Sequence, residues 1–167
     1  MTHAELVARA AKWLRNSRKH RVVLEGIGTD TLECPDVIGW DCAGRSSLVE
    51  CKVSRADFLR DRGKPMRAHP ELGMGMFRWF ATPPGLIRVE ELPPNWGLIE
   101  VLAKVVKVVH KGREFELSPA VHCREKRLLM SALNRATEGW GLQVFGVLSA
   151  GTGVKTQRDS PVSETPL

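Results

Sequence analysis

The sequence predicts an α/β fold with a central sheet flanked by helices. Three observations predict it: an amphipathic helix near the N-terminus, three short apolar segments after it, and a second helix followed by further strands. The chain has 167 residues, with 43% hydrophobic and 26% charged residues, which is ordinary for one globular domain. We expect this domain to cover residues 1–149, with its core at about 2–102 and a C-terminal hairpin and helix at 103–149.

The first helix is expected over residues 2–18. Thr2 can cap its N-terminus, with Glu5 as the capping-box partner three residues later. Apolar residues recur at helical spacing along one side: Leu6, Val7, Ala10, Ala11 and Leu14. His3 falls on this side and Glu5 on the opposite one. From residue 9 to residue 21 the chain carries six Arg or Lys residues and no acid, more one-sided than a mixed solvated face.

Short apolar segments separated by glycine-containing turns predict three strands: residues 21–25, 34–40 and 47–53. A second helix begins at Ser54, with Asp57 as an acid in its first turn. Residues 63–75 contain several Pro and Gly residues and are expected to be irregular.

The second half of the chain continues the pattern. Four more strands are expected, the last two as a hairpin about Lys111-Gly112: residues 76–81, 98–102, 105–110 and 113–117. A last helix over 119–137 presents apolar residues inward and carries basic residues that Glu125 and Glu138 dilute. Residues 150–167 are rich in Ser, Thr and Pro and are expected to be a disordered tail.

The most informative pattern is Asp36 after a proline, with Glu50 and Lys52 following fourteen and sixteen residues later. Strand side chains alternate between faces, so Glu50 and Lys52 share one face of the third strand. Each half of the pattern alone is common, since Glu-x-Lys usually marks a solvated strand face and Pro-Asp a turn. Together they suit hydrolysis of a phosphodiester: carboxylates hold a hard divalent cation, and a lysine stabilises the developing charge.

These residues resemble the PD-(D/E)xK nuclease superfamily, which includes archaeal Holliday junction resolvases and many restriction enzymes. A longer resemblance, to phage and bacterial proteins near the MmcB DNA-repair group, extends over about residues 3–102. It rests on four segments: residues 35–40 (PDVIGW), 49–59 (VECKVSRADFL), 84–87 (PGLI) and 92–98 (LPPNWGL). The resemblance implies a restriction-endonuclease-like core of order αβββαβ, with a mixed sheet, and association with DNA.

The function that follows is a Mg²⁺- or Mn²⁺-dependent DNA endonuclease of DNA repair, recombination or phage DNA processing. Asp36 and Glu50 are the expected metal ligands, and Lys52 completes the catalytic set. Glu25 ends the first strand, beside Asp36 if the first two strands form a hairpin, and is expected as a further ligand. The alternative is a non-catalytic DNA-binding accessory module with the same fold.

Related nucleases often take a ligand from the first helix, and neither His3 nor Glu5 is a clear candidate, so this contribution stays open. Glu33 is expected at the surface. Five residues are expected to contact DNA, mainly through phosphates: Ser54, Arg55, Lys64, Arg67 and Arg78. The net charge of +6 and the pI near 9.5 permit such binding. The resemblance to resolvases also leaves a homodimer open.

Composition also bears on location. No apolar run reaches the roughly 18 residues of a membrane span, and the N-terminus lacks a secretory apolar region. The four cysteines have no Cys-x-x-Cys spacing, so a structural zinc site is not expected. Free thiols and a cytoplasmic location are expected, with no membrane association.

Overall fold

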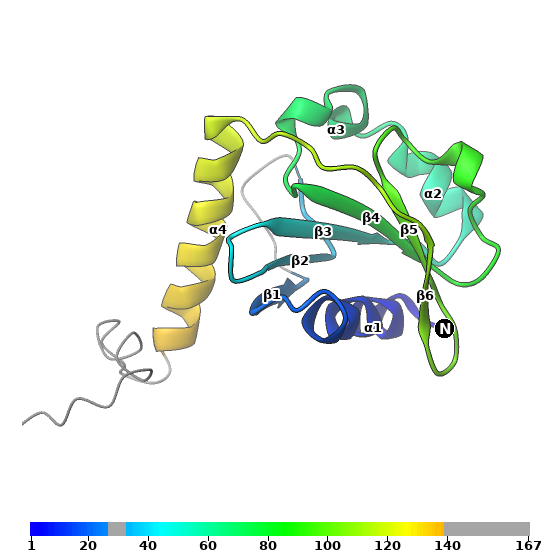
Figure 1. Cartoon of the computed structure of the whole chain (residues 1–167), viewed down its shortest axis with the longest axis horizontal. Helices are drawn as coiled ribbons and strands as arrows, with labels where there is room; N and C mark the ends of the chain where they lie inside the picture. Colours follow the sequence, from blue (N-terminus) through cyan, green and yellow to red (C-terminus); the bar gives the residue numbers. More distant parts are fainter. Residues whose placement is uncertain (27–32, 139–167) are drawn as a thin grey trace, which may run out of the picture. The chain divides into compact units, whose positions relative to one another are not determined.

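The structure, a computed structural model, describes residues 1–26 and 33–138. It is an α/β fold with a six-stranded mixed sheet flanked by helices (Figure 1). The helices are α1 (His3–Asn16), α2 (Arg55–Asp61), α3 (Pro65–Ala68) and α4 (Pro119–Glu138), with 3₁₀ turns η1 (Pro70–Leu72) and η2 (Val89–Glu91). The strands are β1 (Val22–Glu25), β2 (Val37–Trp40), β3 (Ser46–Cys51), β4 (Phe77–Thr82), β5 (Gly97–Val101) and β6 (Val106–His110).

The sheet keeps the strands in chain order, from β1 to β6. Strand β3 pairs in parallel with β4, and β4 with β5, whereas the β1–β2, β2–β3 and β5–β6 pairs are antiparallel. Val37 lies opposite Val49, so the start of β2 and the ends of β3, β4 and β5 share one edge of the sheet. We call this the carboxyl edge. The element order begins helix–strand–strand–strand–helix, as expected from the sequence.

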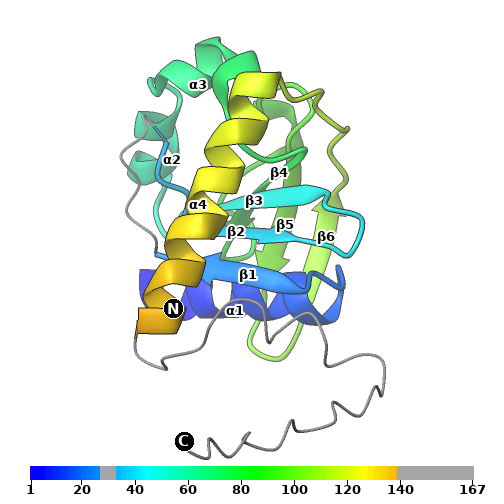
Figure 2. The same cartoon turned by 90° about the vertical axis from the view of Figure 1, so that its left-hand side faces the viewer.

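Helix α1 covers one face of the sheet, and α2 and α3 lie on the other (Figure 1). Turning the view shows α1 running alongside β1 (Figure 2). The expected apolar side of α1 is confirmed, because Leu6, Ala10 and Leu14 are fully buried. The capping box is confirmed too: the Thr2 N–H donates to Glu5 Oε2 at 2.7 Å, and the Glu5 N–H donates to Thr2 Oγ1 at 3.2 Å.

Two sequence-based expectations about elements are wrong. Residues 63–75, expected to be irregular, contain α3 and η1. The strand expected at 113–117 is absent: β6 pairs with β5, and the chain after β6 crosses back over the start of β5, where the Arg113 N–H donates to the Asn95 carbonyl at 3.0 Å. Gly112 is therefore not a hairpin-turn residue but a point of close contact between two backbone segments.

Helix α4 carries a buried acid where a solvated residue was expected. Glu125 is 4% exposed and accepts three hydrogen bonds, from Trp40 Nε1 at 3.1 Å, Ser46 Oγ at 2.9 Å and the Gly75 N–H at 2.8 Å. These bonds join the first part of α4 to β2, β3 and the segment before β4.

The chain divides into two compact units, Met1–Met130 and Ser131–Leu167. In the second unit only residues 131–138, the last part of α4, are described, and the tail expected at 150–167 lies outside the described residues. Within the described ranges, no helix combines the length and the apolar character needed to cross a membrane.

Candidate functional site

Glu50 and Lys52 lie on the same side of the sheet at the carboxyl edge, as the alternation of β3 predicts. Both are buried, with relative exposures of 1% and 5%. Lys52 Nζ lies 3.0 Å from Glu50 Oε2 and 3.1 Å from Oδ1 of Asp61, the last residue of α2. The Glu-x-Lys pair is therefore a buried ion pair rather than a solvated strand face.

Two further cations contact Glu50 and Asp61: Lys64, the N-cap residue of α3, and Arg67 within α3. Lys64 Nζ lies 3.1 Å from Glu50 Oε2 and 2.9 Å from Asp61 Oδ1. Arg67 donates from Nε to Asp61 Oδ2 at 2.6 Å, and its Nη2 lies 3.5 Å from Glu50 Oε1. The guanidinium also lies 4.2 Å from the centre of the Trp96 ring, which fixes its plane. We call Glu50, Lys52, Asp61, Lys64 and Arg67 the ion cluster.

Glu33 belongs beside this cluster and is not at the surface, contrary to expectation. It is 3% exposed and accepts a hydrogen bond from the Met74 N–H at 2.7 Å. Arg67 Nη1 lies 3.6 Å from its Oε1. Burial raises the pKa of Glu33, and the Met74 N–H and the Arg67 charge offset only part of that effect.

Lys52 and Asp61 of the ion cluster keep their charged forms at neutral pH. Burial alone would lower the pKa of Lys52, but the carboxylates of Glu50 and Asp61 outweigh it and raise that pKa. Burial alone would raise the pKa of Asp61, but the Arg67 hydrogen bond and the neighbouring positive charges lower it. Lys52 is therefore an ammonium held in a fixed direction by two acids.

Asp36 lies at the carboxyl edge, immediately before β2. Its Oδ2 accepts a hydrogen bond from the Cys51 N–H at 2.7 Å, and its Oδ1 lies 3.4 Å from Nε2 of His3 at the start of α1. The register that pairs Val37 with Val49 brings Asp36 opposite Glu50. Burial raises the pKa of Asp36, and the negative charge of Glu50 raises it further. The two carboxylates are thus close enough to repel one another.

The donors at this edge fit a hard divalent cation. Glu50 Oε1 is buried without a hydrogen bond, and the ionised form of Asp36 is disfavoured by its surroundings. A cation would relieve both conditions. No group of three His, Cys, Asp or Glu side chains suited to a metal occurs in residues 1–26 and 33–138. Mg²⁺ is usually held by one or two carboxylates together with water and substrate phosphates, so the two carboxylates match the usual number of protein ligands.

Glu25, expected as a further metal ligand, is not brought into this arrangement. Its carboxylate accepts from Arg15 Nη2 at 2.7 Å. It follows Val23 along β1, and Val23 packs on the face that α1 covers, opposite the ion cluster. Of the two open candidates on α1, Glu5 caps its own helix and His3 reaches Asp36.

The residues expected to contact DNA have different positions. Arg67 and Arg78 are wrong as surface phosphate contacts, because the Arg67 side chain is 4% exposed and Arg78 is 1% exposed. Arg78 instead donates to the carbonyls of Gly73 and Gly75. Ser54 caps α2 by accepting from the Asp57 N–H at 3.2 Å.

Lys64 and Arg55 are the two exposed cations of that set. The Lys64 side chain is 41% exposed although its ammonium contacts the ion cluster, so it can reach a ligand. Arg55 is 45% exposed, and its guanidinium already forms a two-pronged ion pair with Glu91. A phosphate at Arg55 would therefore have to compete with Glu91.

Sequence reasoning missed Asp61. A signal existed, because Phe58 and Asp61 are three residues apart on one side of α2 and both are buried. The sequence does not show that this side faces Lys52, since that depends on how α2 packs against the end of β3.

Comparisons with known proteins bear on the fold. No family model and no curated protein matches the chain. Among solved structures it is similar to a protein of unknown function from Silicibacter pomeroyi, with 25% sequence identity and a TM-score of 0.63. The similarity covers 87% of this chain and 98% of that protein. It supports the α/β architecture and carries no information on activity.

Proposed function

We propose that this protein is a Mg²⁺- or Mn²⁺-dependent DNA endonuclease that hydrolyses phosphodiester bonds in DNA repair, recombination or phage DNA processing. The observation that carries the proposal is the meeting of Asp36, Glu50 and Lys52 at the carboxyl edge of the sheet. The resemblance to PD-(D/E)xK nucleases rests on the same three residues. A cytoplasmic location agrees with the free thiols of Cys42, Cys51 and Cys123.

In this proposal Asp36 and Glu50 hold the cation. When bound, the cation supplies Lewis-acid activation of water and of the phosphoryl group. Lys52 is already protonated and directed by Glu50 and Asp61, so it donates hydrogen bonds to the charge that develops on the phosphate without reorganising. Lys64, exposed at the rim, binds a phosphate oxygen of the incoming strand.

A second candidate is a non-catalytic DNA-binding module. One observation favours it: Glu50 is within ion-pair distance of three cations, Lys52, Lys64 and Arg67. If these contacts persist in the presence of DNA, the carboxylate is a structural partner of the cations and does not bind a metal. Lys64 distinguishes the two functions. Its exposed side chain can move away from Glu50 and free the carboxylate for a metal, whereas the buried Lys52 cannot move away.

The test is metal-dependent cleavage of plasmid, single-stranded, flap and four-way-junction DNA. We expect Asp36→Asn and Glu50→Gln to abolish cleavage. Lys52→Ala should reduce the rate by roughly 10²–10³-fold, the usual loss for an electrostatic stabiliser. Glu25→Gln is the matched control and should keep wild-type activity, because Glu25 pairs with Arg15 away from the site.

A readout independent of cleavage is stabilisation by the metal. Mg²⁺ at a hundredfold excess over Kd should add about 2.7 kcal/mol to the free energy of unfolding of the wild type and so raise its melting temperature. It should have no effect on Asp36→Asn. Wild-type protein that is neither stabilised by Mg²⁺ or Mn²⁺ nor able to cut any of the four substrates would overturn the endonuclease proposal. DNA binding by that protein would then support the binding-module alternative.

A further inference from the structure

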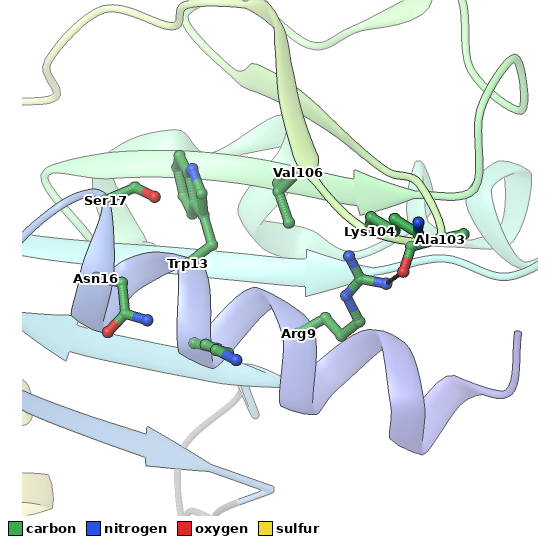
Figure 3. A pocket seen from close by; sticks show the side chains of 8 residues that line it. Arg9, Trp13, Asn16, Ser17, Ala103, Lys104 and Val106 are labelled. Carbon is green, nitrogen blue, oxygen red and sulfur yellow. Dashed lines mark hydrogen bonds between the residues drawn. The ribbon is translucent and has the colours of Figure 1, made fainter.

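A second positively charged site lies on the face of the sheet that α1 covers. It is a pocket of about 370 Å³ between α1 and the turn from β5 to β6 (Figure 3). Its lining includes three cations, Arg9, Lys12 and Lys104, together with the polar side chains of Asn16 and Ser17. No acid lines it.

Helix α1 and the β5–β6 turn are joined at one wall of this pocket. Arg9 donates from Nη1 to the Ala103 carbonyl at 2.8 Å (Figure 3). Its Nη2 donates to the Val105 carbonyl at 3.4 Å. Arg9, Lys12 and Asn16 follow one another at intervals of three and four residues, so they share one side of α1. The pocket is therefore formed by two fixed elements.

Lys12 and Lys104 carry charges that no acidic side chain of the described residues compensates. Both side chains are exposed, and neither forms an ion pair with any residue in the described ranges 1–26 and 33–138. Two uncompensated ammonium groups with Arg9 beside them make a site of positive potential. Such a site favours an anionic ligand.

We propose that this pocket binds a backbone phosphate of DNA. An aromatic residue does line it, but Trp13 is 5% exposed and packs edge-on against Trp79 with ring centres 5.1 Å apart. Its face is not available for stacking on a base. The site can thus bind phosphate but cannot distinguish bases, which is how positioning contacts to nucleic acid work.

The inference rests on the proposed function, because the position of the pocket suits the same substrate. Ala103 and Lys104 follow the end of β5, and Lys52 follows the end of β3, so one wall of the pocket lies at the carboxyl edge and the rest extends along α1. Helix α1 connects the two sites: His3 contacts Asp36, and Lys12 lies roughly 14 Å farther along the helix axis. That distance is about four steps of one duplex strand, within reach of a single DNA molecule.

The test is binding of a fluorescently labelled duplex by anisotropy, with Ca²⁺ in place of the catalytic metal. The variant Lys12→Gln with Lys104→Gln removes both free charges, and Lys111→Gln with Lys126→Gln removes two exposed charges elsewhere. Each phosphate contact contributes about −0.9 to the salt slope on duplex DNA. Between 50 and 200 mM salt the affinity of the wild type should fall about 3.5-fold more than that of the pocket variant, whereas the control should match the wild type.

The outcomes separate this inference from the proposed function. If the wild type cleaves DNA and the pocket variant has the same salt slope as the wild type, the pocket does not bind phosphate and the proposed nuclease activity is unaffected. If the pocket variant has a reduced salt slope and the wild-type protein cleaves none of the substrates, the phosphate site is supported and the proposed nuclease activity is contradicted. Displacement of the duplex by inorganic phosphate as efficiently as by unlabelled duplex, at equal phosphate-group concentration, would overturn the assignment to a polymer backbone. Should the double variant fail to fold, each single substitution should lower the slope by about half as much.

Discussion

Asp61 is the residue on which the candidate site depends most and which the sequence marks least. It contacts three cations at once, with Lys52 at 3.1 Å, Lys64 at 2.9 Å and Arg67 at 2.6 Å. Its carboxylate is 2% exposed, so water cannot replace it. The direction in which Lys52 points therefore depends on a residue nine positions later in the chain.

We predict that Asp61→Asn destabilises the fold. Removing one partner of a buried ion pair leaves uncompensated charge and costs roughly 3–5 kcal/mol of unfolding free energy. Asp57→Asn, in the same helix, is the control. Its carboxylate is 33% exposed and 3.7 Å from Arg60, so the loss should stay below about 1 kcal/mol. Chemical denaturation of both variants measures the difference, and equal losses would show that the cluster is not held by Asp61.

Among the elements, the segment after β6 departs most from its expected form. Gly112 follows an alternating apolar run, a pattern that suggests a hairpin turn. In the structure the backbone at Gly112 instead contacts the residues at the start of β5. A side chain at Gly112 would place its Cβ 2.2 Å from the Asn95 carbonyl oxygen and 2.6 Å from the Gly97 nitrogen. Phe115, farther along, lies with its ring 4.0 Å from the Arg78 guanidinium, and its N–H donates to the Met76 carbonyl.

We predict that Gly112→Ala is destabilising by about 1–3 kcal/mol, since the atoms it meets are backbone and cannot move independently. Gly63→Ala is the matched control. Its nearest neighbour would be the Arg60 carbonyl oxygen at an ordinary 3.5 Å, and its effect should be near zero. Midpoints of urea denaturation would distinguish them. A neutral Gly112→Ala would mean that the crossing segment shifts freely from β5.

On the scale of the whole molecule, Glu125 attaches the first part of α4 to the sheet through hydrogen bonds within an otherwise apolar contact. Val121 and Leu128 are buried with Ile38, Leu48 and Phe80 on the face opposite α1. Glu125 lies between them in sequence and satisfies donors from two strands and a loop. The packing and these hydrogen bonds place the first part of α4 against β2 and β3.

We predict that Glu125→Ala lowers the free energy of unfolding by roughly 3 kcal/mol or more, because each buried donor left without an acceptor costs about 1–3 kcal/mol. Lys126→Ala, at the next position and exposed, should change stability by less than about 0.5 kcal/mol. Thermal and chemical denaturation of the two variants provide the measurement. Similar behaviour of both would show that α4 is held by apolar contacts alone.

The sequence by itself determined the features that depend on neighbouring residues. The capping box of Thr2 and Glu5, the buried side of α1 and the alternation of β3 are local, because helix and strand geometry fix which side chains share a face. The same alternation placed Glu50 and Lys52 together. Asp36 joined them through the antiparallel register of β2 and β3, which the hairpin turn sets.

Only the tertiary structure decided which charges are buried and which are free. Arg67, Glu33 and Glu125 have sequence surroundings typical of solvated residues, and their side chains are buried because other segments supply their partners. Arg78 stands in an apolar strand, and the loop before that strand supplies its carbonyl partners. Burial of a charge is favourable only when opposite charge or hydrogen bonds meet it. Those partners come from other elements, so the local sequence pattern cannot identify them.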